Sequence, residues 1–164
     1  MLEVFSLRMA TMRDIARELP TRDLDSPDEI AEMVRRFYAD VAQDDLLGPM
    51  FNEVARVDWS EHLPKLTAFW CRALLGLPGY QGNPFRAHAL VHSERAFTPA
   101  HFERWLTLFH ETVDIGWTGP NAQRAHEVAD NVARLHSHQL IGQEPVPISR
   151  SPERSVEIGA DRLR

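Results

Sequence analysis

The stretch TPAHFERWLTLFHETV, residues 98–113, carries the clearest structural signal in this chain. Its apolar side chains recur every three or four residues, the spacing that places them on one face of an α-helix: Phe102, Trp105, Leu106, Phe109 and Val113. The pair Thr98-Pro99 is typical of a helix start, because threonine can cap the first turn and proline fits its first position. We therefore predict a helix that opens at this pair and buries an aromatic face.

Four other segments have helical spacing and are bounded by similar start or stop signals. They run from Pro27 to about Gln43, from Asp58 or Ser60 to about Leu75, from Asn83-Pro84 to about Leu90, and from Gly119-Pro120 to about Leu140, before Gly142. Glycine and proline residues predict a loop over residues 76–84. No segment shows sustained alternation of apolar and polar residues, so the sequence predicts an all-α domain.

Length and composition limit the class of protein. The chain has 164 residues, enough for one domain, which we expect to span 26–141 between an N-terminal extension (1–25) and a disordered tail (142–164). A net charge of −6 argues against nucleic-acid binding, which needs a basic face. The single cysteine excludes an intrachain disulfide and a cysteine-rich zinc site. Because there is neither a secretory apolar segment nor a membrane-spanning apolar run, we expect a soluble cytoplasmic protein without a membrane partner.

The chain contains eight histidines, which suggest metal or cofactor binding. His62 and His88 lie on apolar helix faces, where a hydrogen-bonded core histidine is commoner than a ligand. His88 and His92 are four residues apart and could share a metal ion, but no third ligand is evident. The remaining histidines have polar or charged neighbours and are predicted to be mostly solvated: His92, His101, His110, His126, His136 and His138.

Two aromatic residues have both a structural and a ligand-binding interpretation. Tyr38 follows Phe37 on the first helix, and it can be a boundary residue or a hydrogen-bond donor in a pocket. Trp105 can be a core residue, or it can present its indole N–H to the same pocket. The sequence contains no nucleophile elbow and no glycine-rich phosphate loop. The residues alone leave both interpretations open.

Five segments, taken in order along the chain, resemble the group III truncated haemoglobins. They are FYADV (37–41), LLGPMF (46–51), DWSEHLPKLTAFW (58–70), YQGNPFRAH (80–88) and FERWLTLFHETVD (102–114). The absence of a Gly-Gly dipeptide also suits this subfamily. The resemblance covers roughly residues 27–141 and implies a truncated globin, a sandwich of two helices over two that encloses one non-covalently bound haem b (iron protoporphyrin IX).

The resemblance also implies roles for individual residues. It makes His88 the proximal iron ligand and places Tyr38, His62 and Trp105 on the distal side, where a bound ligand reacts. The set that it implies for cofactor binding is Phe37, Phe51, His62, Leu66, Phe69, His88 and Trp105. From helix geometry we further expect the second ring N–H of His88 to donate to the carbonyl of Pro84, four residues earlier.

The activity implied by the resemblance is binding of dioxygen, nitric oxide and carbon monoxide at haem iron. Several hydrogen-bond donors would retain dioxygen, which suits nitric oxide oxidation or peroxide turnover better than oxygen carriage. Such turnover would need an external electron donor, because the chain has no flavin or nicotinamide motif. The alternatives are an oxygen or nitric oxide sensor or storage globin without turnover, and an all-α interaction module without a cofactor.

Overall fold

The fold is built from helices and loops. The computed structural model describes residues 19–142, and in that range it contains no β-strand, which confirms the all-α prediction. The elements are α2 (Pro27–Gln43), the π-helix η1 (Met50–Val54), α3 (Trp59–Leu75), α4 (Pro84–Glu94), α5 (Pro99–Gly116) and α6 (Pro120–Ile141). The expected tail and most of the expected N-terminal extension lie outside the described residues. Among residues 19–142, no helix is long and apolar enough to cross a membrane.

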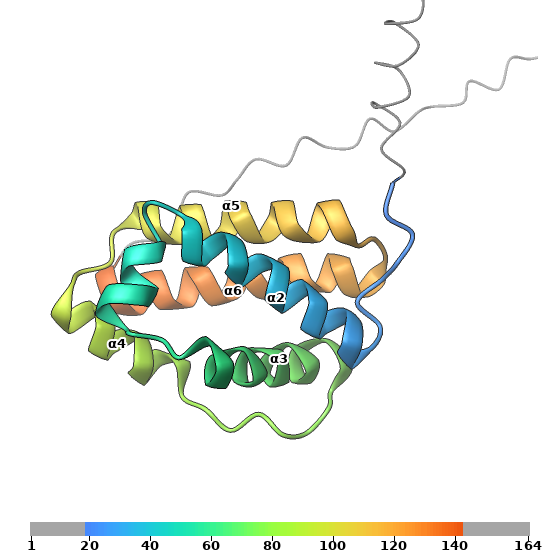
Figure 1. Cartoon of the computed structure of the whole chain (residues 1–164), viewed down its shortest axis with the longest axis horizontal. Helices are drawn as coiled ribbons and strands as arrows, with labels where there is room; N and C mark the ends of the chain where they lie inside the picture. The colour runs from blue at the N-terminus through green and yellow to red at the C-terminus, as the bar shows by residue number, and fades with distance from the viewer. Residues whose placement is uncertain (1–18, 143–164) are drawn as a thin grey trace, which may run out of the picture.

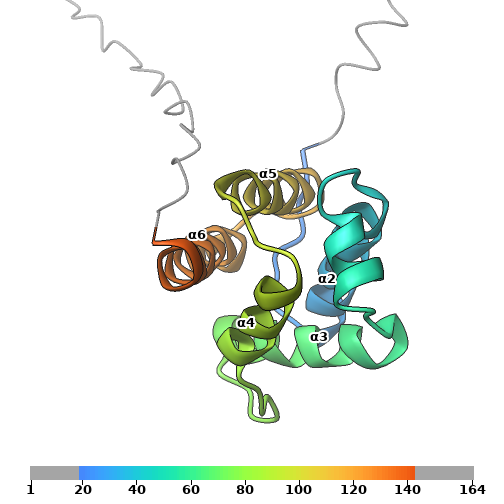
Figure 2. The same cartoon turned by 90° about the vertical axis from the view of Figure 1, so that its left-hand side faces the viewer.

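The long helices form two antiparallel pairs. The pair α2 and α3 packs against the pair α5 and α6, through contacts of α2 with α5 and of α3 with α6 (Figure 1). The shorter α4 lies at one end of the bundle, where it contacts α6 and η1 (Figure 2). This is the two-over-two arrangement that the sequence predicted.

Local start and stop signals set the helix ends. The Ser26 side chain accepts the Glu29 amide at 3.3 Å, so it caps α2 as predicted. Gly142 ends α6 with a left-handed φ of +67°, a conformation that glycine adopts without a steric penalty. The predicted end of α4 near Leu90 is wrong, because the helix continues to Glu94. No glycine or proline interrupts residues 91–94, and the backbone turns to an extended conformation only at Arg95.

Residues just before α2 also belong to the packed structure. Leu24 is fully buried in the core. The Asp23 carboxylate accepts the amides of Asn121 at 3.1 Å and Ala122 at 2.8 Å, so it caps the N-terminus of α6. The core therefore begins slightly before residue 26, within the segment expected to be an extension.

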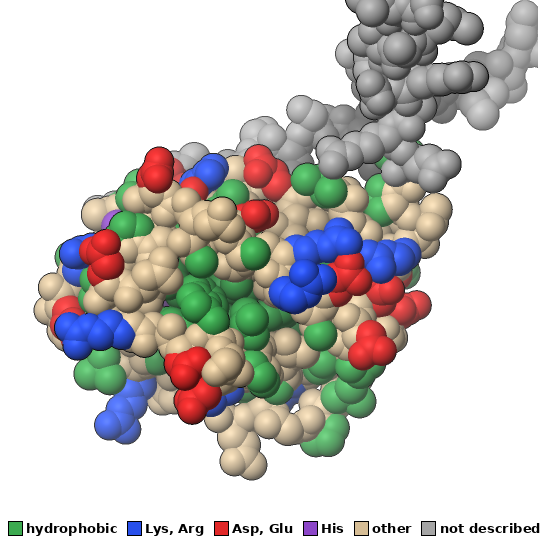
Figure 3. Space-filling model, in the orientation of Figure 1, with side chains coloured by type: hydrophobic (Ala, Val, Ile, Leu, Met, Phe, Trp, Pro, Cys, Tyr) green, Lys and Arg blue, Asp and Glu red, His purple; other side chains and the backbone are tan. Residues whose placement is uncertain are grey.

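Aromatic residues fill the centre of the bundle. The rings of Trp70 and Phe109 stack with centroids 4.8 Å apart, and Phe37 meets Phe109 edge-on at 5.2 Å. Trp117 is also buried, and its indole N–H donates to the Glu29 carboxylate at 2.6 Å. On the face drawn in Figure 3, apolar side chains reach the surface in a hollow that charged side chains surround. The close packing of these rings makes α2, α3 and α5 a firm support for the cavity beside them.

Candidate functional site

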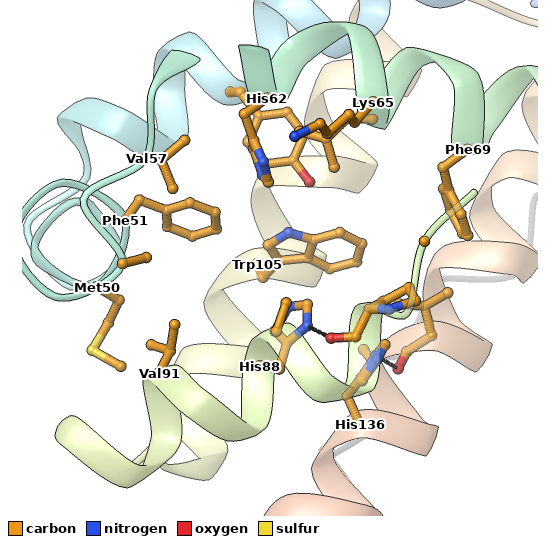
Figure 4. A pocket seen from close by; sticks show the side chains of 18 of the residues that line it. Met50, Phe51, Val57, His62, Lys65, Phe69, His88, Val91, Trp105 and His136 are labelled. Atoms are coloured by element: carbon orange, nitrogen blue, oxygen red, sulfur yellow. Dashed lines mark hydrogen bonds between the residues drawn. The ribbon is translucent and has the colours of Figure 1, made fainter. Parts of the chain in front are cut away.

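One cavity of about 420 Å³ lies between the two helix pairs and α4. Side chains from η1, from the loop before α4 and from each of the helices α2 to α6 line it, and most of them are apolar (Figure 4). This volume is in the range of roughly 300–1,000 Å³ that is typical of small-molecule sites. The cavity is therefore the candidate binding site.

His88 enters the cavity from α4. Its Nδ1 lies 2.6 Å from the Pro84 carbonyl oxygen, which confirms the predicted hydrogen bond. A carbonyl can only accept, so Nδ1 carries the hydrogen and Nε2 keeps a free lone pair. Burial lowers the pKa of His88 by more than the hydrogen bond to Pro84 raises it, so the imidazole is neutral at pH 7. A neutral, oriented imidazole with a free Nε2 is suited to bind a metal.

Three polar side chains line the cavity together: Tyr38 from α2, His62 from α3 and Trp105 from α5. Burial strongly raises the pKa of Tyr38, and a hydrogen bond from the Trp105 indole lowers it only in part, so the phenol keeps its proton. Burial, followed by the proximity of Lys65 and His88, lowers the pKa of His62. All three side chains are therefore neutral at pH 7, and Tyr38 and Trp105 are hydrogen-bond donors.

The apolar residues predicted at the site divide into two groups. Phe51, Leu66 and Phe69 line the cavity. Phe37 does not line the cavity, because it is fully buried in the core. Its ring packs edge-on against Trp105, with a centroid distance of 5.4 Å. Phe37 therefore supports Trp105 from the core and does not line the cavity.

Two histidines of the site were not predicted from the sequence. His101 and His136, which were predicted to be mostly solvated, both line the cavity. The signal for His136 was present, since it follows Val132 by four residues on the same apolar stripe of α6. The shared metal site of His88 and His92 is not supported, because Nδ1 of His92 accepts the Phe97 amide at 2.9 Å. Among residues 19–142 no group of three or more metal-binding side chains is present.

The prediction of solvation was also wrong for a histidine pair away from the cavity. His126 is 4% exposed and its Nδ1 is hydrogen-bonded to Nδ1 of His110 on the neighbouring helix. The other ring nitrogens pair with carboxylates, His110 with Asp130 at 2.8 Å and His126 with Asp114 at 2.9 Å. These four side chains connect α5 to α6 and lie outside the cavity lining.

A buried tyrosine, a partly buried tryptophan and an imidazole around an apolar cavity, within two crossed helix pairs, are the features of a globin. The model of the bacterial-like globin family matches residues 24–140. The chain is 32% identical over 114 residues to the group 3 truncated hemoglobin ctb of Campylobacter jejuni. The aligned region covers 68% of this chain and 85% of that protein. The crystal structure of a group III truncated hemoglobin from Campylobacter jejuni matches with a TM-score of 0.63 and 31% identity, and covers 70% of this chain and 91% of that one.

These matches identify the chain as a member of the bacterial-like globin family. They also confirm the resemblance to the group III truncated haemoglobins and the truncated globin fold. The protein is a haem-binding globin, in agreement with the size and apolar lining of the cavity and the free Nε2 of His88.

Proposed function

We propose that the cavity holds one haem b, with His88 as its axial ligand, and that the protein binds dioxygen and other diatomic gases. The observation that carries the proposal is the position of His88, whose Nε2 is free in the same cavity that Tyr38 and Trp105 line (Figure 4). The only cysteine, Cys71, is buried on α3 and is not among the cavity residues, so we propose non-covalent binding.

The residues around the cavity fit the parts of a haem. Phe51, Leu66 and Phe69 offer apolar contacts to a porphyrin. Lys65 is an exposed cation in the lining and would pair with a propionate. When bound, the haem iron supplies a coordination position for a diatomic ligand and one-electron chemistry.

The distal residues determine which ligands the cavity retains. Dioxygen becomes partly negative when it binds, and the O–H of Tyr38 would stabilise that charge by donating a hydrogen bond. The N–H of Trp105 donates to the Tyr38 oxygen and so supports this donor. Strong retention of dioxygen opposes carriage, which needs release. We therefore propose redox chemistry, such as oxidation of nitric oxide or turnover of peroxide, with electrons from an external donor. We also propose that the protein works in the cytoplasm.

A haem titration tests the binding proposal. The wild-type protein and the His88→Ala variant are mixed with haemin, and His92→Ala, one turn further along α4 and outside the cavity lining, is the matched control. We expect an intense Soret band at one haem per chain in the wild type and the control, and a shifted or lost band in His88→Ala. Added imidazole should restore the band if His88 is the ligand. A wild-type protein that binds no haem would refute the proposal.

Rapid mixing tests the redox part. The oxygenated protein is mixed with nitric oxide, and the ferric protein and nitrate are measured, followed by re-reduction with a supplied electron donor. Repeated consumption of nitric oxide would support turnover. Stable binding of the gases without consumption would show a sensor or storage globin instead.

A further inference from the structure

His136 lies directly beside His88 in the cavity wall. The two ring centroids are 4.6 Å apart, and the ring planes differ by 33°. The next aromatic neighbour of His88, Phe97, is more distant, with centroids 6.1 Å apart. In Figure 4, His136 approaches from α6 on the side where His88 is hydrogen-bonded to α4. The side chain in closest ring contact with His88 therefore comes from a different helix.

His136 is itself held in place. Its Nδ1 lies 3.0 Å from the carbonyl oxygen of Val132, one turn earlier on α6, and therefore carries the ring hydrogen. The same arrangement holds His88 to Pro84 on α4. His136 is a fixed, flat surface against His88.

The hydrogen bond to Pro84 does not fix the orientation of the His88 ring by itself. It holds Nδ1 near the carbonyl, but rotation about the bond from Cβ to the ring is broad in histidine. Within Pro84–Glu94, all of it described, no side chain is fully buried, so α4 offers little packing of its own. A ring in contact with one face of His88 restricts this rotation, and His136 is the ring so placed.

We propose that His136 is a positioning residue that sets the plane of the His88 imidazole. This inference rests on the proposed role of His88 as the axial ligand. The direction of the imidazole plane decides how its orbitals overlap with those of the iron and how far the ring can tilt. The α6 helix therefore takes part in tuning the cofactor through one side chain.

Two substitutions of similar size distinguish the effect of a flat ring from the effect of side-chain volume alone. His136→Phe keeps a flat ring and removes both nitrogens, and His136→Leu fills the space without a ring. His138→Leu, at an exposed position on the same helix, is the matched control. Each haem-loaded variant is examined by resonance Raman spectroscopy of the ferrous form and by proton NMR of the ferric cyanide form. The first reports the iron–imidazole stretch, and the second reports the direction of the imidazole plane through the haem-methyl shifts.

We expect His136→Leu to shift or broaden the iron–imidazole band and to change the pattern of haem-methyl shifts. His136→Phe and His138→Leu should keep the wild-type pattern. The proposal is overturned if His136→Leu matches the wild type, or if His136→Phe differs from it as much as the leucine variant does. A wrong assignment of His88 as the axial ligand would give a different result. In that case the iron–imidazole band would persist in the His88→Ala variant. If His136→Leu does not take up haem, His136→Val, which also lacks a ring, takes its place in the comparison.

Discussion

Asp44 connects the turn after α2 to α5 through hydrogen bonds and an ion pair. Replacing it should destabilise the whole domain. One carboxylate oxygen accepts the amides of Leu46 at 3.1 Å and Leu47 at 3.0 Å. The other accepts Nε of Arg104 at 2.6 Å. The Asp44 side chain is 7% exposed and that of Arg104 is 43% exposed. Because Leu47 also lines the cavity, the turn positions part of the site.

The free-energy cost of Asp44→Ala depends on whether water can replace the lost carboxylate at each of its hydrogen-bond partners. Leu46 is exposed, so water can replace the carboxylate at its amide. The amide of Leu47 is left partly buried without an acceptor, which costs about 1–2 kcal/mol. The half-exposed Arg104 can turn to water, so the loss of its ion pair costs only about 1 kcal/mol. We expect Asp44→Ala to lower the free energy of unfolding by about 2–3 kcal/mol at pH 7. Asp44→Asn keeps an oxygen for the amides and should cost about 1 kcal/mol.

The same contacts predict a dependence on pH. Burial alone would raise the pKa of Asp44, but hydrogen bonds from the Leu47 amide, the Arg104 side chain and the Leu46 amide lower it below the ordinary value. The charged form is therefore favoured in the folded state. Its contribution to stability is complete above the ordinary aspartate pKa of about 3.9, and it is lost as the pH falls through the lower folded value. The stability difference between the wild type and Asp44→Asn should persist at pH 5 and close below about pH 4.

Urea unfolding followed by circular dichroism measures these differences. The haem-free protein is used, so that haem loss does not enter the measured free energy. Asp45→Asn, at the exposed neighbouring position, is the control and should change the free energy of unfolding by less than about 0.5 kcal/mol. An Asp44→Ala variant that is as stable as this control would refute the stabilising role of the Asp44 contacts. A stability difference between the wild type and Asp44→Asn that stays constant from pH 7 down to pH 3 would refute the contribution of the Asp44 charge.

Three further substitutions test other contacts. Tyr38→Phe removes a buried donor worth about 1.5–3 kcal/mol, so dioxygen should leave the haem-loaded protein roughly 10–150 times faster in a stopped-flow replacement experiment; an unchanged rate would exclude Tyr38 as a donor. Gly119→Ala should cost about 2–3 kcal/mol in thermal unfolding, because φ is +132° and a Cβ would lie 2.6 Å from Cγ of Asp23; a neutral result would contradict the described cap of α6. Trp117→Phe should cost about 2–4 kcal/mol, because the hydrogen bond to Glu29 and part of a buried ring are lost, and a loss below 1 kcal/mol in urea unfolding would argue against this contact.

The helix starts could be predicted because each depends on neighbouring residues. Ser26-Pro27, Asn83-Pro84 and Thr98-Pro99 all mark the first turn of a helix. The π-helix over Met50–Val54 could not be predicted, since its hydrogen bonds span five residues and no local pattern specifies them. Arg56, just after it, has a φ of +49°, which a side chain of this kind adopts only when surrounding contacts require it.

The site could be predicted from the family resemblance more than from periodicity. Helical spacing placed Phe37 and Trp105 on inward faces, but it cannot distinguish a core position from a cavity wall. His126 and His136 were missed because charged or polar neighbours in the sequence suggested solvent exposure. In a helix those neighbours point to other faces, and the contacts that enclose the two rings come from distant parts of the chain.

The helix that carries His88 depends on the cavity for its own order. Because α4 buries no side chain fully and exposes Phe85 and Leu90, few of its contacts oppose local opening. Haem in the cavity would supply an apolar surface against its inner side and a bond to His88. Amide hydrogen exchange in residues 84–94 should therefore slow far more on haem binding than exchange in α5 or α6. Among residues 19–142, limited proteolysis of the haem-free chain should cut this segment first. Haem binding would thus lengthen the lifetime of the chain in the presence of a protease.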